Sequence, residues 1–106
     1  MKIQLRVAEL HPEQIERYEQ LHREIPRANL EGIYRAGVGK MQIFRHGNLL
    51  VMYTEENEAS VQPPTPETEA AGQRWRTLTE PLFSQPWADV PLIFALDSES
   101  FEGRLE

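Results

Sequence analysis

The first pattern along the chain is an alternation of apolar and polar side chains over residues 2–10. Ile3, Leu5 and Val7 fall on one face of an extended chain, whereas Gln4 and Arg6 fall on the other. Because successive side chains of a strand point to opposite faces, this pattern predicts a half-buried β-strand.

Over residues 11–37 the apolar spacing changes to steps of three and four, which predicts a helical region. Pro26 is expected to interrupt it and Gly37 to end it, because proline breaks a helix interior and glycine favours a helix terminus. Tyr18 and His22 lie one turn apart on the face expected to be buried. The apolar face comprises Ile15, Tyr18, Leu21, His22 and Ile25 before the proline, and Leu30, Ile33 and Tyr34 after it.

Two strand-like runs follow, over Val38–Arg45 and Leu49–Thr54. The link His46-Gly47-Asn48 contains the glycine and asparagine that a tight hairpin turn needs, because both tolerate a positive φ. Residues 49–53 are apolar on both faces. This indicates that both faces of the predicted sheet are covered.

The polar, proline-rich residues 55–66 predict a loop. A second helix is expected to start at Thr65 or Pro66, with Thr65 as its cap, and Pro81 is expected to kink or end it. Residues 86–91 then predict a connection, residues 90–96 a final alternating strand, and the residues after Asp97 a frayed tail. The apolar positions of the second helix are Ala71, Trp75, Leu78, Leu82 and Phe83.

The predicted order of strand, helix, strand, strand, helix, strand is the ferredoxin-like βαββαβ pattern of the α+β class. In this fold the helices cover one face of an antiparallel four-stranded sheet and leave the other face bare. The apolar side chains that remain for the bare face would form too large an exposed patch for a monomer. We therefore predict a homodimer that packs sheet against sheet through the open face.

The chain of 106 residues is short enough to predict a single domain over 1–106. Its formal charge of −6 disfavours a nucleic acid or an anionic membrane surface as the main partner. No run of about 18 apolar residues and no signal-peptide pattern occurs, so we expect neither a membrane protein nor an exported one. The lack of cysteine fits a reducing cytoplasm. The histidines at 11, 22 and 46 lack the close spacing of a zinc site, so no metal is expected.

Several short motifs are spread along the chain: Tyr18-Glu-Gln-Leu-His22, Ala36-Gly37, Asn48-Leu49-Leu50, Gln73-Arg74-Trp75 and Leu92-Ile-Phe94-Ala-Leu96. Their order and spacing together resemble the L-rhamnose mutarotase family. The resemblance covers nearly the whole chain, apart from the last few residues and part of the 55–70 loop.

This resemblance implies a dimeric α/β barrel that interconverts the α and β anomers of a monosaccharide without a cofactor. It also implies that His22 is the proton donor and that Tyr18, Met41, Trp75 and Arg76 contact the sugar. The chain departs from the family pattern at three places. Lys40-Met41 stands where the family has Asn-Tyr, Trp75-Arg76 where it has Trp-Trp, and His22-Arg-Glu-Ile-Pro26 where it has His-x-x-Ile-Trp-Pro.

Mutarotation needs one group to protonate the ring oxygen while another accepts the proton of the anomeric hydroxyl. Histidine suits this task because its ordinary pKa of about 6.5 lets it hold or release a proton near neutrality. Tyr18 would orient the sugar or the imidazole. Taken alone, however, His22 is expected to be a hydrogen-bonded histidine of the core. Trp75 is equally expected to be a core side chain or a ring on which the sugar stacks. Arg76 alone reads as a solvated helix residue and Lys40 as a strand-edge lysine.

We therefore predict a cytoplasmic sugar mutarotase with His22 as its acid/base group. The rival prediction is a non-catalytic, dimeric domain that binds a sugar or another small ligand. A cofactor-free oxygenase is a third reading, by fold analogy alone. If Lys40 and Arg76 both enter the pocket, the preferred sugar should carry a carboxylate or phosphate, because an unpaired buried charge seeks an opposite one.

Overall fold

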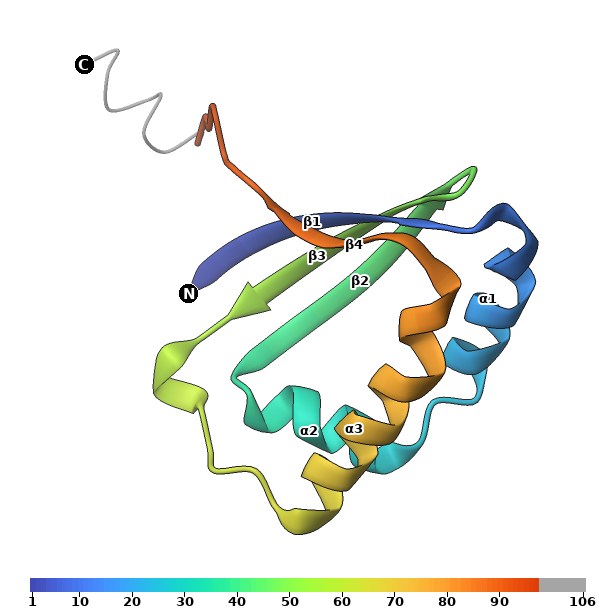
Figure 1. The fold of residues 1–106 in the computed structure, drawn as a ribbon. Coiled ribbons are helices and arrows are strands. Elements are labelled where there is room, and N and C mark those ends of the chain that lie inside the picture. Colours follow the sequence, from blue (N-terminus) through green and yellow to red (C-terminus); the bar gives the residue numbers. More distant parts are fainter. Residues whose placement is uncertain (98–106) are drawn as a thin grey trace.

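The computed structural model describes residues 1–97 and has the predicted ferredoxin-like α+β order (Figure 1). Three short 3₁₀ turns flank the main elements, at Pro12–Gln14, Glu58–Ser60 and Glu80–Leu82. The main elements are β1 (Lys2–Leu10), α1 (Ile15–Arg23), α2 (Arg27–Arg35), β2 (Val38–His46), β3 (Leu49–Glu56), α3 (Pro66–Thr79) and β4 (Phe83–Val90).

The strands form one antiparallel sheet in the order β2-β3-β1-β4. The first strand thus pairs with both β3 and β4, so strands distant in sequence lie side by side. The helices all lie on one side of this sheet (Figure 1). The predicted fold class is confirmed.

The core lies at one end of the helix-facing side of the sheet. Ala8, Leu10 and Leu50 are almost fully buried there, against Tyr18 of α1 and Leu82. Burial of a leucine side chain contributes about 1.5–3 kcal/mol, so these contacts hold α1 firmly on the sheet.

The two faces of β1 do not follow a simple apolar-inside rule. Gln4 and Arg6 share the helix-facing side with Ala8 and Leu10, because side chains two apart lie on one face. Ile3, Leu5 and Val7 therefore look to the open face, where Ile3 is 60% exposed. The helix-facing side is thus apolar at one end and polar at the other.

The cap of the second helix and the glycine turns agree with the sequence predictions, but two predicted apolar positions of that helix lie outside it: Leu82 belongs to the 3₁₀ turn Glu80–Leu82 and Phe83 begins β4. The Thr65 hydroxyl accepts a hydrogen bond from the Thr68 N–H at 3.1 Å, which caps α3, and the helix ends at Thr79, two residues before Pro81. The turn before β2 uses Gly37 at φ +90°, and the hairpin uses Gly47 at φ +61°. Over the residues that the structure describes, no helix is both long and apolar enough to cross a bilayer.

The predicted final strand over residues 90–96 is wrong, and so is the predicted connection over 86–91. The fourth strand is instead Phe83–Val90, and residues 91–97 have no regular structure. Pro86 is tolerated inside this strand because β4 is a sheet edge with an irregular register between its pairs Glu9–Gln85 and Val7–Ala88. The predicted frayed tail after Asp97 lies outside the described residues.

Candidate active site around His22

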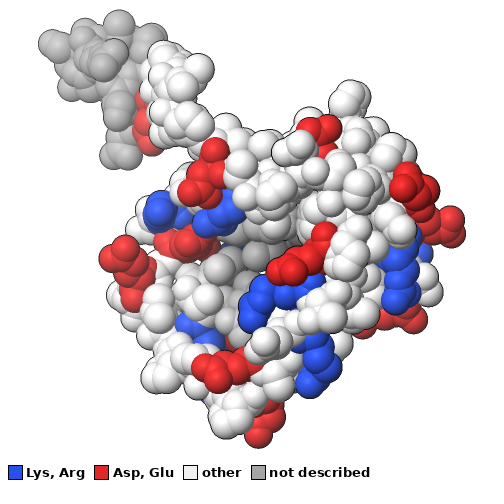
Figure 2. Space-filling view, viewed as in Figure 1, with Lys and Arg blue, Asp and Glu red and all other residues white. Residues whose placement is uncertain are grey.

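A cavity of about 870 Å³ lies between α1, α2 and β2. In Figure 2 the molecule is hollowed on the side shown, with acidic and basic side chains close together around the hollow. Tyr18 and His22 of α1 line the cavity, and Met41 and Ile43 of β2 lie in its wall. Leu30 and Ile33 of α2 also line it, so part of the predicted apolar helix face borders a cavity rather than the core.

The orientation of His22 is set within its own helix. Its Nδ1 lies 2.9 Å from the backbone carbonyl oxygen of Tyr18, one turn earlier. Because a carbonyl oxygen only accepts, Nδ1 is the donor and holds the proton of the neutral ring. This leaves Nε2 as the nitrogen that can exchange a proton with a ligand.

Aromatic rings hold the imidazole on two sides. The Tyr18 ring lies 4.3 Å from the His22 ring, and the Trp75 ring of α3 meets it edge-on at 5.0 Å. Tyr18 is itself held edge-on by Phe83 at 5.6 Å. Such ring pairs each stabilise their arrangement by about 0.5–1.5 kcal/mol, so α1, α3 and the start of β4 together fix the imidazole.

Tyr18 is buried, and desolvation by this burial raises the pKa of its phenol well above the usual range. A phenol is already neutral at physiological pH, and this shift keeps the hydroxyl protonated and able to donate a hydrogen bond at more alkaline pH as well. Over residues 1–97 no protein hydrogen bond to this hydroxyl is formed. Tyr18 is one of the residues that line the cavity.

The structure brings Tyr18, His22 and Met41 together around one cavity, with Trp75 against the His22 ring. Lys40 also borders the cavity, but as the strand neighbour of Met41 its side chain leaves from the opposite face.

Arg76 does not border this cavity. With Trp75, it lines a separate groove of about 320 Å³ between α2 and α3. The condition for an anionic sugar, that Lys40 and Arg76 both enter one pocket, is therefore not met.

Other charged groups border the cavity without forming a metal site. Glu19, one turn before Arg23 in α1, forms an ion pair with Arg45 of β2 and so ties the helix to the sheet edge. In the part of the chain that the structure describes, no three His, Asp or Glu side chains are grouped as metal ligands require.

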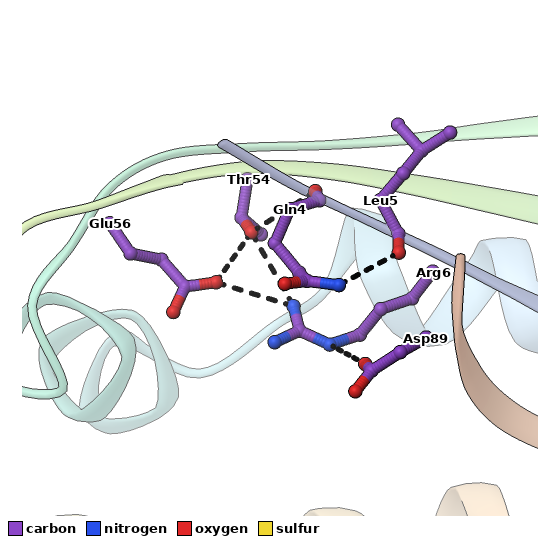
Figure 3. Close-up of polar contacts among 6 residues, drawn as sticks. All are labelled: Gln4, Leu5, Arg6, Thr54, Glu56 and Asp89. Atoms are coloured by element: carbon purple, nitrogen blue, oxygen red, sulfur yellow. Dashed lines mark hydrogen bonds and ion pairs between the residues drawn. The ribbon is translucent and has the colours of Figure 1, made fainter. Parts of the chain in front are cut away.

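One polar group on the helix-facing side of the sheet is not singled out by any sequence motif. We call it the Arg6 cluster: Arg6, Thr54, Glu56 and Asp89 (Figure 3). The only sequence signal for it is Arg6 itself, on the polar side of the alternation in β1. Its partners come from two other strands, so their proximity depends on the register of the sheet.

Comparison with solved structures places the fold among proteins of known architecture. An L-rhamnose mutarotase from Formosa agariphila superposes with a TM-score of 0.71 at 12% identity, covering 92% of this chain and 100% of that one. A putative antibiotic biosynthesis monooxygenase from Nitrosomonas europaea superposes with a TM-score of 0.55 at 14% identity, covering 83% and 84%. At these identities the likeness shows the fold alone.

The sequence comparisons give the family. No curated protein sequence matches the chain. The family model of L-rhamnose mutarotase matches residues 4–96, which is most of the sequence and includes the elements that carry Tyr18, His22 and Trp75. The chain therefore belongs to the L-rhamnose mutarotase family of carbohydrate isomerases.

Proposed function

We propose that this protein interconverts the anomers of a neutral aldose such as L-rhamnose, with His22 as the acid/base group. The observation that supports this most is the fixed imidazole at the cavity wall, whose Nδ1 donates to the Tyr18 carbonyl oxygen at 2.9 Å. Nε2 is then the nitrogen left for proton transfer. Family membership supports the reaction type.

In the proposed reaction, Nε2 of the protonated His22 ring donates a proton to the ring oxygen of the sugar. The anomeric hydroxyl loses its proton to a base, the bond between C1 and the ring oxygen breaks, and the open aldehyde forms. Rotation about the C1–C2 bond turns the other aldehyde face to the chain hydroxyl. The reverse proton transfers then close the ring as the other anomer, so no cofactor is needed.

The Tyr18 hydroxyl, a neutral phenol whose pKa burial raises further, would donate a hydrogen bond to a sugar oxygen. Met41 would supply an apolar wall for the C–H groups of the sugar. Fixed orientation matters here because proton transfer requires a donor–acceptor distance near that of a hydrogen bond.

Saturation-transfer NMR on L-rhamnose, L-fucose and D-glucuronic acid tests the proposal directly. We expect faster exchange between the two anomeric protons for at least one neutral sugar when the protein is added. Line broadening of a bound sugar without faster exchange would favour the rival reading, a non-catalytic binding domain. Acceleration of D-glucuronic acid alone would contradict the choice of a neutral substrate.

Trp75→Ala is expected to lower the exchange rate by about twofold to tenfold, which is what one aromatic pair is worth. The reason is the edge contact of Trp75 with the His22 ring at 5.0 Å, which restrains the imidazole. Trp75→Phe keeps an aromatic edge and should recover most of the rate. Rates are compared by saturation transfer, with thermal unfolding followed in parallel. A large fall in Tm with an unchanged rate would mean that Trp75 serves packing alone.

We propose, as the sequence predicted, that the protein is a homodimer through the open sheet face. Val7, Phe44 and Val51 are cross-strand partners in one row on that face, and Phe44 is 57% exposed. An apolar sheet face of this kind is an unfavourable surface to leave in water. A second copy presents the same face and is its simplest cover.

Light scattering at micromolar concentration should give the mass of two chains, and Phe44→Glu should shift it toward one chain. Leu78→Glu is the matched control, because Leu78 is 47% exposed but lies on α3, away from the open face. A single-chain mass for the unaltered protein would exclude the dimer. The cytoplasmic location remains a prediction.

A further inference from the structure

The Arg6 cluster lies beside the His22 cavity without being part of its lining, and Glu56 borders a separate pocket of about 260 Å³ together with Gly37 and Asn57. The strand register places Ile43, Met52, Arg6 and Asp89 in one row across the helix-facing side of the sheet. In the next row, Met41 is the partner of Thr54. Because partners on one face lie about 4.5–5.5 Å apart, the cluster begins one strand away from the cavity residues Met41 and Ile43.

The cluster is held by polar contacts of 2.6–3.4 Å (Figure 3). Arg6 Nε donates to Asp89 Oδ1 at 3.2 Å, and Nη1 donates to Glu56 Oε2 at 3.3 Å and to Thr54 Oγ1 at 3.4 Å. The Thr54 hydroxyl donates to the same Glu56 oxygen at 2.6 Å. Side chains of two neighbouring strands, β3 and β4, thus position the guanidinium, and the Arg6 side chain is 29% exposed.

Two groups of the cluster remain open to a ligand. Across residues 1–97, neither the Nη2 of Arg6 nor the Oε1 of Glu56 forms a hydrogen bond or an ion pair. In Figure 3 both atoms point away from the strands. Nη2 offers two hydrogen-bond donors and Oε1 offers an acceptor. A sugar hydroxyl can accept from the first and donate to the second. Two neighbouring hydroxyls match this pattern.

We propose that Arg6 and Glu56 form a second sub-site, which binds a pair of hydroxyl groups of the sugar and decides which sugars are accepted. This inference rests on the proposed function, because the sugar bound at His22 would extend past Met41 and Thr54 to reach this neighbouring site. Glu56 and Asp89 balance the charges of Arg6 and of Lys2, the strand partner of Glu56. The site therefore has no excess positive charge to attract a uronic acid or a sugar phosphate, which favours a neutral sugar.

The environment of Glu56 supports an acceptor role. The hydrogen bond from Thr54 lowers the pKa of this carboxyl, and the charge of Arg6 acts in the same direction, while partial burial opposes both. The carboxylate is therefore ionised at neutral pH and accepts hydrogen bonds from hydroxyls. It is too weak a base for the proton transfer that we assign to His22.

The test compares wild type and Arg6→Lys on L-rhamnose and its 2-, 3- and 4-deoxy analogues, by exchange rate and by binding in NMR titration. Lysine keeps the charge but removes the planar fork that supplies Nη2. For wild type, we expect at least one analogue to lose about tenfold or more in kcat/KM and in affinity, since a hydrogen bond to a charged group is worth about 1.5–3 kcal/mol. Arg6→Lys should bind L-rhamnose more weakly. For this variant, kcat/KM and affinity should differ by less than about threefold between L-rhamnose and the same analogue.

Two further variants keep the outcome clear. Glu56→Gln retains an acceptor oxygen but loses the charge, and it should reduce the discrimination against the same analogue. Arg35→Lys is the control, because Arg35 forms an ion pair with Glu31 on α2, outside the Arg6 cluster, and it should preserve every ratio. Equal ratios for wild type, Arg6→Lys and Glu56→Gln would overturn the sub-site while leaving the mutarotase intact. Absence of both exchange and binding for every sugar would overturn the proposed function and the sub-site with it.

Discussion

Replacing His22 by alanine is expected to slow anomer exchange by about 10²–10⁴-fold, the usual contribution of a general acid–base group. The imidazole is half-buried, and its Nδ1 is engaged by the Tyr18 carbonyl oxygen at 2.9 Å. The variant loses Nε2. Among the described residues, no other histidine ring contacts Tyr18 or Trp75, so no neighbouring imidazole can replace it. Saturation-transfer NMR on the best sugar of the panel measures the rate.

His22→Asn is the cleaner variant, because it keeps polarity and much of the volume. His46→Ala is the matched control, since His46 ends β2 at the hairpin and is exposed. We expect the control to retain the full rate. If His22→Asn remains folded and loses less than about threefold, the imidazole is not the proton-transfer group.

The second large effect is expected at Gly37, where α2 turns into β2. Its backbone has φ +90°, a region that costs an L-residue about 1–2 kcal/mol. A Cβ at this position would lie 2.7 Å from the Asn57 carbonyl oxygen and 3.0 Å from Val61 Cγ2. The backbone N–H of Asn57 also donates a hydrogen bond to the Gly37 carbonyl oxygen at 2.8 Å, so the two segments cannot separate without losing that bond. Gly37→Ala should therefore reduce the free energy of unfolding by more than about 2 kcal/mol.

Gly47→Ala separates the clash from the backbone strain. Gly47 also has a positive φ, of +61°, but a Cβ there would meet no atom within 4 Å. Gly47→Ala should therefore reduce the free energy of unfolding only by the cost of the strained backbone, about 1–2 kcal/mol. Urea unfolding of both variants measures the difference. Equal losses would show that the contact with Asn57 relaxes without cost.

The final strand shows where local patterns mislead. Residues 90–96 alternate well, whereas Phe83–Val90 contains Pro86. Proline cannot donate to a sheet ladder, so sequence reasoning favours the alternating run. The edge position of β4 and its irregular register beside Glu9 remove that objection. Leu92, Ile93 and Phe94, which were expected inside the strand, are at least 76% exposed.

In the candidate site, too, local contacts follow from the sequence, whereas contacts between distant elements do not. The pairing of Tyr18 with His22 follows from a spacing of four within one helix, so the sequence predicts it. The contact of His22 with Trp75 and the position of Met41 in the cavity wall involve α3 and β2. The resemblance to a family anticipated these residues, but no periodicity within the chain does. The same resemblance also named Arg76, which lies in the groove between α2 and α3.

The sequence by itself determined the element order, the cap at Thr65, the turn at Gly37 and the juxtaposition of Tyr18 and His22. Each of these depends on residues within a few positions of one another, where local sterics and hydrogen bonding decide the outcome. Only the tertiary structure decided that the polar side of β1 faces the helices and that Arg6 meets Glu56 and Asp89. The physical reason is that alternation defines two faces of a strand but not which one is covered. That choice depends on the burial of Ala8 and Leu10 against distant elements and on the register that joins three strands.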